Sequence, residues 1–403
     1  MATLFLGGGV FDGRGTLEDG LGVLVEAAAI ARVAPAAEFD GFDGETVDTT
    51  GRTLMPGLID CHVHLCMAGA ADPWVPLAKA TPGEIVVTAL TLARDNLAGG
   101  ITAVRDCGGK DYLEFAVRDA CNAGTFQGPT IRAAGRMICM TGGHGNRIGR
   151  IADGPDQVVQ AVREQIHAGC DFVKIMATGG VMTPGVNPED AHYSAAEMAA
   201  GVGEAKRFHR RTASHAQGTE GILNAVRAGI NSIEHGFFMS DDCVAEMVAA
   251  GVYLVPTIAA LKNIVANKRN GIPAYVVEKA ERVAEAHRAS IRRYYEGGGQ
   301  IAMGTDAGTP FNLHGRNAAE LGHMVEYGIA ARDALVAATG NAADLLDLAD
   351  EGEIAAGKRA DLLVVEGNPL DDIQAAADPA RHVAVYKRGA LVDARRPTNV
   401  GRT

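Results

Sequence analysis

The chain has 403 residues, too many for one ordinary hydrophobic core, and suits a barrel of about 250–300 residues with a smaller domain beside it. The formal net charge is −12 and no basic run is present, which argues against nucleic acid and anionic membranes as partners. Apolar residues make up 47% of the chain and charged residues 21%, the balance of an ordinary soluble globular protein.

The cysteines indicate a reducing compartment. They are odd in number and widely spaced, and no two form a Cys-x-x-Cys pair, so a disulfide framework is not expected. Residues 1–6 lack the basic and apolar regions of a signal peptide, and no apolar run reaches the about 20 residues of a membrane span. We therefore expect a cytoplasmic protein. The seven cysteines are Cys61, Cys66, Cys107, Cys121, Cys139, Cys170 and Cys243.

Both ends of the chain have the composition of short β-strands. Runs 4–6, 22–25 and 30–33 are separated by glycines, and runs 360–366 and 383–389 have the same character. We predict that the two ends pair into one small sheet domain. It would contain residues 1–55 and 352–403, with residues 56–351 inserted between them.

Between residue 54 and about residue 350, short apolar runs alternate with helical patterns such as 156–168 and 220–228. Ser194 and Glu197 form a capping box that predicts a helix over 195–208, and the connection 258–300 holds extra helix. Eight parallel strands with crossover helices predict an α/β fold, a (β/α)8 TIM barrel. The predicted strands are 54–64, 101–106, 130–134, 172–176, 212–215, 232–235, 253–257 and 301–306.

The first predicted strand ends in Asp60-Cys61-His62-Val63-His64. Residues i and i+2 of a strand point to the same side, so His62 and His64 present two neighbouring imidazoles, while Cys61 faces away. Neutral imidazole is the commonest protein ligand for metals. Two half-buried structural histidines are the alternative for this motif taken alone.

Active sites of barrels lie at the C-terminal ends of the strands. Four of the other predicted strands also carry metal-type ligands, mostly at their ends. Each histidine alone could be a hydrogen-bonded structural residue, but their coincidence on one rim predicts a metal site. The predicted ligands are His62, His64, Lys174, His215, His235 and Asp306.

Lys174 lies inside the apolar run 172–176, where a buried ammonium is costly. It could pair with a carboxylate or reach out of the barrel mouth. Alternatively, a mostly neutral lysine could add carbon dioxide and become a carbamate. A carbamate has the shape and charge of a carboxylate, and it could therefore bridge two divalent ions.

These motifs resemble the amidohydrolase superfamily, and within it the imidazolonepropionase-related, prolidase-like branch of binuclear zinc enzymes. The resemblance rests on Pro-Gly-Leu-Ile-Asp-Cys-His-Val-His, Phe-Val-Lys-Ile, Ser-His-Ala, Ser-Ile-Glu-His-Gly and Met-Gly-Thr-Asp. It extends to the tail motifs at 339–343, 352–354 and 357–362. The resemblance implies a β-sandwich, formed by the two terminal segments, beside the barrel.

The resemblance also implies the role of each ligand. His62, His64 and Asp306 would hold the more buried ion, and His215 and His235 the more exposed one. Zinc is the expected metal, because these N/O ligands suit it.

A carboxylated Lys174 would bridge the two ions together with a hydroxide, which would be the nucleophile. Asp306 would accept the proton of the attacking water and pass it to the leaving nitrogen. His144, in the glycine-rich loop 141–146, would donate to the substrate carbonyl. A loop histidine without function is the alternative for His144.

One position departs from the family pattern. Dipeptidase-type relatives tend to carry a tyrosine two places after the strand-five histidine, where it meets the substrate carboxylate, and this chain has Gln217 there. Arg147, Arg150 and Arg316 are candidate replacements in loops. The departure puts dipeptide cleavage in doubt.

We therefore predict a metal-dependent hydrolase that cleaves an amide-type C–N bond of a small molecule. The substrate could be an amide, N-acyl amino acid, dipeptide, carbamate or urea. Two alternatives stay open: the same fold acting on an ester, lactone or phosphoester, and a non-catalytic scaffold. A scaffold would be expected to have lost ligands, whereas all six positions are present here. Homo-oligomer formation is left open.

Overall fold

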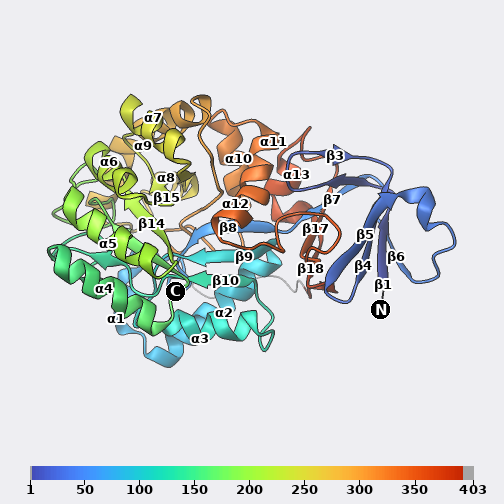
Figure 1. Cartoon of the computed structure of the whole chain (residues 1–403), viewed down its shortest axis with the longest axis horizontal. Helices are drawn as coiled ribbons and strands as arrows, with labels where there is room; N and C mark the ends of the chain where they lie inside the picture. Colours follow the sequence, from blue (N-terminus) through green and yellow to red (C-terminus); the bar gives the residue numbers. More distant parts are fainter. Residues whose placement is uncertain (1, 394–403) are drawn as a thin grey trace.

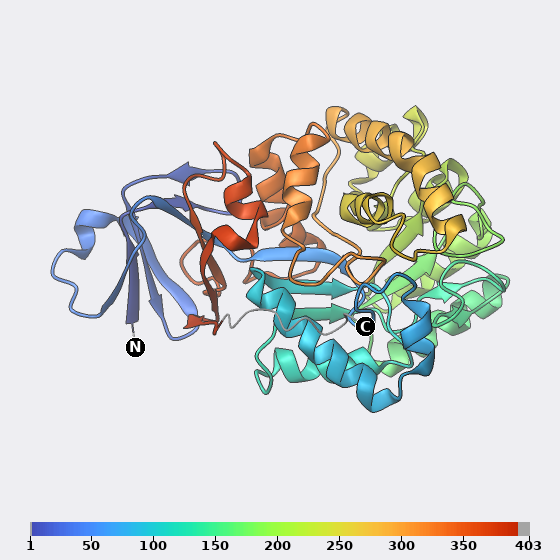
Figure 2. The same cartoon turned by 180° about the vertical axis from the view of Figure 1, so that it is seen from behind.

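The computed structural model describes residues 2–393, so residues 1 and 394–403 of the predicted terminal domain lie outside the described part. Strands from the two ends of the chain lie together at one end of the molecule (Figure 1). The helices surround a set of parallel strands at the other end, as the view from behind also shows (Figure 2).

The terminal segments form two sheets. The first has the order β5 (Ala29–Pro35), β4 (Leu21–Glu26), β1 (Ala2–Leu6) and β6 (Glu45–Asp48), and a 3-10 turn, η1 (Ala36–Phe39), follows β5. The second joins both ends of the chain, because β17 pairs antiparallel with β7. Its order is β19 (Ala390–Leu391), β18 (His382–Lys387), β17 (Leu362–Glu366), β7 (Arg52–Pro56), β2 (Gly9–Phe11) and β3 (Leu17–Glu18).

The two terminal sheets share a hydrophobic core. Phe5, Val23 and Ile30 of the first sheet pack with Leu54 and Val364 of the second. Burying such side chains contributes about 1.5–3 kcal/mol each, so the core stabilises the pairing of the two chain ends.

Most of the predicted strands of the middle region are present and parallel. They form the orders β10-β9-β8 and β12-β11-β13-β14-β15-β16. The predicted strands 101–106, 172–176 and 232–235 are confirmed to the residue. These strands are β8 (Leu58–Val63), β9 (Ile101–Asp106), β10 (Thr130–Ala133), β11 (Ile138–Cys139), β12 (Arg150–Ile151), β13 (Phe172–Met176), β14 (Arg211–Ala216), β15 (Ser232–His235) and β16 (Tyr253–Val255).

The first and last predicted strands differ from the structure. Run 54–64 is two strands, because β7 ends at Pro56 in the terminal sheet and β8 starts at Leu58 among the parallel strands. Gly57 makes the transition, where a Cβ would lie 2.2 Å from the Thr102 side chain. A continuous apolar run does not show that its two halves belong to different sheets.

Segment 301–307 is not a regular strand, yet it lies between β16 and β8. It forms parallel bridges from Ile301 to Leu254 and from Ala307 to Val63. The amide of Asp306 also donates to the carbonyl of His62 at 2.7 Å. These contacts close the circuit of parallel segments on one side, and Asp306 is brought beside the end of β8.

Helices cover the parallel strands, which gives the α/β class that the sequence predicts. The capping box of Ser194 and Glu197 is confirmed at the start of α5. The predicted extra helix in 258–300 is α8 and α9, and Figure 2 shows α8 end-on among the loops. The helices are α1 (Trp74–Lys79), α2 (Pro82–Ala98), α3 (Leu113–Asn122), α4 (Pro155–Ala168), α5 (Ala195–Arg207), α6 (Thr219–Ala228), α7 (Asp241–Ala250), α8 (Ile258–Ala266), α9 (Ala274–Glu296), α10 (Ala319–Glu326), α11 (Ala331–Ala337), α12 (Gly340–Leu345), α13 (Gln374–Ala377) and the 3-10 turn η2 (Pro379–Arg381).

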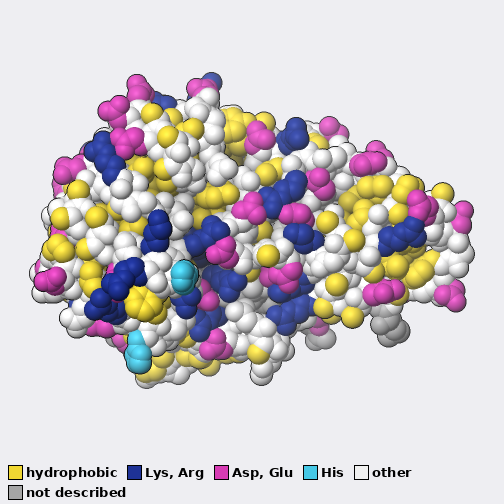
Figure 3. Space-filling view, viewed as in Figure 1, with side chains coloured by type: hydrophobic (Ala, Val, Ile, Leu, Met, Phe, Trp, Pro, Cys, Tyr) yellow, Lys and Arg dark blue, Asp and Glu magenta, His cyan; other side chains and the backbone are white. Residues whose placement is uncertain are grey.

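The seven cysteines are free and buried. Within residues 2–393, no helix is both long and apolar enough to span a membrane. Acidic and basic side chains are interspersed on the face of the molecule shown in Figure 3.

Candidate metal centre

All the side chains predicted as site residues line one cavity, near the C-terminal ends of the parallel strands. Strands β8, β13, β14 and β15 each contribute at least one of them, and the others come from the segments after β8, after β11 and after Ile301. The structure thus brings together His62, His64, His144, Lys174, His215, His235 and Asp306.

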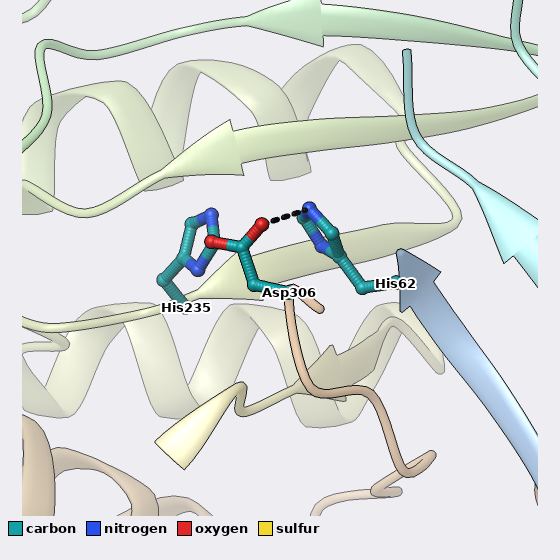
Figure 4. A group of neighbouring side chains, drawn as sticks. All are labelled: His62, His235 and Asp306. Carbon is teal, nitrogen blue, oxygen red and sulfur yellow. Dashed lines mark ion pairs between the residues drawn. The ribbon is translucent and has the colours of Figure 1, made fainter. Parts of the chain in front are cut away.

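Three of these residues form the tightest group. Ligand atoms of His62, His235 and Asp306 all lie within 4.8 Å of one another. Asp306 Oδ1 lies 3.5 Å from His62 Nε2 and 3.3 Å from His64 Nε2, and Figure 4 shows Asp306 between His62 and His235. The ring centroids of His215 and His235 are 4.6 Å apart.

Each histidine has one ring nitrogen held by an oxygen. His62 Nδ1 donates to Glu234 Oε2 at 2.8 Å, and His64 Nδ1 donates to the Gly108 carbonyl at 2.8 Å. This leaves Nε2 of both residues facing Asp306. Such partners set the tautomer and orientation of metal-binding histidines.

The other two histidines follow the same arrangement. His215 Nε2 donates to the Gly179 carbonyl at 2.8 Å, and His235 Nδ1 is hydrogen-bonded to Thr257 Oγ1 at 2.7 Å. Each ring therefore keeps its second nitrogen for a ligand.

Burial controls the charge of these imidazoles. It lowers the pKa of His62, His215 and His235 well below the ordinary value, so they are neutral and suited to a metal. Burial also acts to lower the pKa of His64, but the hydrogen bond and charge of Asp306 outweigh it and raise that pKa.

Backbone conformation at the site is unusual. His235 has φ +73° and Asp306 φ +61°, and Thr257, which orients His235, has φ +51°. Non-glycine residues rarely adopt this left-handed region, and such strain concentrates at functional sites.

The surroundings of Lys174 show whether these residues fit a metal centre. Its side chain is 2% exposed, and its Nζ has no hydrogen-bond partner among the described residues. The carboxylate partner considered from the sequence is absent there. A buried amine without a partner costs several kcal/mol. Together with neutral imidazoles and a carboxylate around it, this amine fits a site completed by carbon dioxide and metal ions.

His144 lies beside the predicted ligands. Its ring centroid is 4.4 Å from that of His215, and its Nδ1 is 2.8 Å from Thr183 Oγ1. Burial lowers the pKa of His144 to about 3, so the ring is neutral. Gly180 packs against it, because a Cβ there would lie 2.6 Å from the imidazole.

Charged residues that hydrogen-bond with the predicted ligands, or hold their strands, were not predicted from the sequence. Glu234 is fully buried, and it accepts from His62 and from Arg105 Nη2, the latter at 2.7 Å. Asp60 accepts from the Thr305 hydroxyl at 2.6 Å and from Asn317, which ties β8 to segment 301–307. A charged residue inside an apolar strand, the signal used for Lys174, would also have found Arg105 and Glu234.

Two buried cysteines, Cys61 and Cys107, lie near the site. Cys61 packs in an apolar cluster with Ile59 and Ala103, as its strand position predicts. Cys107 lines the cavity and lies within 4.8 Å of His62 and Glu234. Burial raises the pKa of the Cys107 thiol to about 12, so the thiol is protonated in the metal-free protein.

The candidate arginines lie apart from the predicted ligands. Arg150 pairs with Glu164 at 2.5 Å, and Arg316 is exposed. Arg147 stacks on the Trp74 ring, 5.6 Å from its centroid, and lines an outer cavity with Asn146 and Pro184. Gln217 is buried beside His215 and His235.

A larger cavity lies elsewhere, with a volume of about 440 Å³. Its lining pairs arginines with carboxylates, such as Arg211 with Asp347 and Arg118 with Asp171. It contains none of the predicted ligands, so we assign it a structural role.

Comparisons with known proteins agree with this geometry. The model of the amidohydrolase family matches residues 53–392. Ochratoxinase of Aspergillus niger is 31% identical over 372 residues, which cover 84% of this chain and 75% of that protein. Imidazolonepropionase of Acidiphilium cryptum (strain JF-5) is 27% identical over 405 residues, covering 90% and 92% of the two chains.

A solved structure is similar over almost its whole length. A Xaa-Pro dipeptidase with methionine bound in its active site has a TM-score of 0.89 and 33% identity, covering 97% of this chain and 99% of that chain. The chain therefore belongs to the amidohydrolase family and is an enzyme that acts on C–N bonds. Within that family it is similar to prolidase-like proteins.

Proposed function

We propose that this amidohydrolase uses two divalent metal ions, with zinc expected, to hydrolyse an amide-type C–N bond of a small molecule. The observation that carries the proposal is the unpartnered amine of Lys174, buried among four imidazoles and the carboxylate of Asp306.

Six side chains would hold the metal ions. His62, His64 and Asp306 would bind one ion, and His215 and His235 the other. Lys174 would bridge them after its neutral amine adds to the carbon of carbon dioxide, forming an N–C bond and releasing one proton. When bound, the ions would supply an activated water and polarise the scissile carbonyl.

The protein residues would then move one proton and stabilise one charge. Asp306 would take a proton from the water on a carboxylate oxygen and give it to the leaving nitrogen, which neutralises the departing amine. His144 would donate from Nε2 to the carbonyl oxygen as that oxygen gains negative charge. Thr183 supports this role, because its hydroxyl lies within hydrogen-bond distance of Nδ1 and can select the required tautomer.

We also infer a closed (β/α)8 barrel for residues 56–351 and a β-sandwich for residues 1–55 and 352–403. The bridges of segment 301–307 and the shared core of the terminal sheets support these assignments. A cytoplasmic location stays a prediction.

Elemental analysis and a substrate panel test the function together. Protein purified without chelator should contain about two divalent ions per chain, because the chain offers two ligand groups. It should hydrolyse members of a panel of N-acyl amino acids, dipeptides, aryl amides, carbamates and phenylureas, and lose this activity after chelation. Well under one ion per chain would refute the metal centre.

The Lys174 carbamate has its own test. A crystal structure of the fully metallated protein should show density for a carboxyl group on Nζ. Lys174→Ala should lose most activity, and bicarbonate with a short-chain acid should restore part of it. Density that ends at the amine would refute the carbamate without refuting metal binding.

Ester, lactone or phosphoester hydrolysis is the second candidate. The pocket around Gln217 contains no lysine or arginine among the described residues that line it, so it suits an uncharged ester or lactone as well as an uncharged amide. Matched ester and amide substrates would separate the two reactions. A non-catalytic scaffold, which would be expected to have lost metal ligands, would contain little metal and hydrolyse neither substrate.

A further inference from the structure

Two pockets meet at the candidate metal centre. The first, here the methionine pocket, is lined by Met67, Trp74, Met137, Met176 and Met182. The second, here the α8 pocket, is lined by Val181, Phe237, Ala260, Leu261 and Ile264. Both also contain His144, Met182, His215, His235, Asp306 and Thr309.

The shared residues indicate where the reacting bond lies. His144, His215, His235 and Asp306 are the groups proposed to act on the scissile bond, and they lie between the two pockets. A substrate centred there extends in both directions. One of its halves therefore occupies the methionine pocket and the other occupies the α8 pocket.

The walls of both pockets favour apolar groups. Methionine side chains adapt to irregular shapes and make favourable contacts with aromatic rings, so the methionine pocket, whose volume is about 40 Å³, suits an aromatic group once these flexible side chains move aside. Leu261 and Ile264 come from the buried face of α8, and Phe237 follows β15. Burying an apolar part of the substrate against these side chains stabilises binding by about 25 cal/mol per Å² of apolar surface removed from water.

The pockets lack a partner for a carboxylate. Among the described residues that line them, Lys174 is the only lysine, and no arginine is present. Since Lys174 is committed to the metal centre, a carboxylate in the α8 pocket would have no cationic side chain among these residues to pair with, which is costly. Arg147 lines the outer cavity, which shares Trp74 and Gly145 with the methionine pocket.

Gln217 is the one polar group of the α8 pocket outside the predicted catalytic set and the threonines. Its side chain is buried, and Oε1 has no hydrogen-bond partner among residues 2–393. Its backbone is fixed, because its amide donates to Thr178 Oγ1 at 3.0 Å and its carbonyl accepts from Phe238 at 2.8 Å. A substrate that donates a hydrogen bond to Oε1 would satisfy this buried oxygen.

We propose that the substrate is uncharged and apolar on both sides of the cleaved bond, with an aromatic group in the methionine pocket. Its other half fills the α8 pocket and donates an N–H or O–H hydrogen bond to Gln217 Oε1. The inference rests on the proposed function for the reaction itself, but ligand binding tests it separately.

Tryptophan fluorescence supplies that binding measurement. Trp74 lines the methionine pocket and is the only tryptophan of the chain, so its emission reports a ligand there. The purified metal-loaded protein is mixed rapidly with N-benzoyl-L-phenylalaninamide or with N-benzoyl-L-phenylalanine, and emission is recorded before turnover. Hydrolysis of both compounds is followed in parallel. The two probes differ only in a carboxamide against a carboxylate.

We expect the amide probe to bind at least about tenfold more tightly than the acid, because only the acid buries an unpaired charge. Equal or tighter binding of the acid would overturn the proposal. Hydrolysis of the acid alone would do the same and leave the proposed reaction standing. Preferential binding of the amide without hydrolysis of any panel compound would refute the reaction and keep the pocket assignment.

Variants at Gln217 locate the contact. Gln217→Leu should weaken the amide probe by about three- to tenfold and leave N-benzoyl-L-phenylalanine methyl ester unchanged, since the ester group has no donor. The near-isosteric Gln217→Glu, a second test if the first variant does not fold, should weaken the acid further. Arg147→Met is the matched control and should not alter the preference. Loss of acid binding in Arg147→Met, with the acid preferred by the wild type, would assign recognition to Arg147.

Discussion

At the scale of single residues, Asp306 combines the side chain of a predicted metal ligand with a left-handed backbone conformation. Its φ is +61°, its Oδ1 lies 3.5 Å from His62 Nε2 and 3.3 Å from His64 Nε2, and Figure 4 shows the carboxylate between His62 and His235. Asparagine tolerates this backbone region better than most residues. A substitution that changes the charge but keeps the shape is therefore available.

Asp306→Asn should lower kcat at least about a thousandfold while the fold survives, because an amide does not accept the proton of the water. Steady-state kinetics gives kcat, and circular dichroism and elemental analysis control for folding and metal content. A variant that keeps more than a tenth of the wild-type kcat would point to another base.

His144 packs against Gly180, and substitutions at both positions test its role. His144→Ala should lower kcat about a hundredfold or more with bound metal unchanged, because one oxyanion donor contributes about 2.7–4 kcal/mol. Gly180→Ala should lower kcat about tenfold or more, since the added Cβ displaces the imidazole.

Gly203→Ala is the control for Gly180→Ala. Gly203 lies within helix α5, and a Cβ added there would have no atom of the described residues within 4 Å, apart from the helix's own backbone and its two chain neighbours. Alanine at this position should raise the unfolding free energy by about 0.5–1 kcal/mol without altering kcat. If Gly180→Ala behaves like Gly203→Ala, Gly180 does not position His144.

Glu114, in the first turn of α3, is a buried acid with no hydrogen-bond partner for either carboxylate oxygen among the described residues. Burial, and then the nearby charge of Asp106, raises its pKa from about 4.5 to about 8, although Arg118 opposes the shift. Because the folded-state pKa is raised, the stabilisation is fully present below about pH 4.5. It is lost as the pH rises towards 8.

Glu114→Gln should remove this pH dependence, because the amide does not titrate. Its unfolding free energy relative to wild type should increase by a few kcal/mol between pH 5 and pH 8, since each pKa unit corresponds to about 1.4 kcal/mol. Urea denaturation of both proteins at pH 5, 6.5 and 8 measures the difference. Parallel curves would show that Glu114 ionises normally.

At the scale of elements, Glu197 joins the starts of two helices. It completes the capping box of α5 with Ser194 and accepts from the amide of Gly154, just before α4, at 2.9 Å. Glu84 completes a similar box with Thr81 at the start of α2, where its side chain accepts from the amide and the hydroxyl of Thr81. The two acids are a matched pair that differs by one contact to a second helix.

Glu197→Ala should therefore cost more stability than Glu84→Ala, about 1–2 kcal/mol against about 0.5–1 kcal/mol. Chemical denaturation of both variants measures this difference. An equal cost would mean that the contact with Gly154 contributes nothing.

At the scale of the whole molecule, Lys387 connects the terminal sheets to the parallel strands. This residue of β18 donates from Nζ to Asp361 at 2.6 Å, and to Thr102 O of β9 and Thr130 Oγ1 of β10, each at 2.8 Å. Its side chain is 9% exposed. The ammonium is thus a buried link between the two parts of the fold.

Lys387→Met should lower the unfolding free energy by about 3–5 kcal/mol, because it leaves a buried carboxylate without its cation. Lys268→Met is the control. Lys268 pairs with Glu281 in an exposed position, so its loss should cost less than about 1 kcal/mol. Denaturant titration measures both, and similar costs would show that Lys387 is not a structural link.

The sequence by itself predicted the candidate metal ligands and determined most of the strands, because both follow from local pattern. Alternation and apolar runs predict β9, β13 and β15 to the residue, since adjacent side chains on a strand have fixed directions. The candidate ligands stand out because imidazoles, a lysine and a carboxylate fall together on the predicted strands, mostly at their ends.

Only the tertiary structure decided how these residues are supported and what surrounds them. The pairing of His62 with Glu234 and Arg105 joins residues far apart in the chain, and no local pattern contains it. The break between β7 and β8 at Gly57, and the irregular shape of segment 301–307, depend on which distant strands the backbone groups hydrogen-bond with. The two apolar pockets are likewise assembled from loops, α1 and α8, whose shapes are set by packing between distant segments.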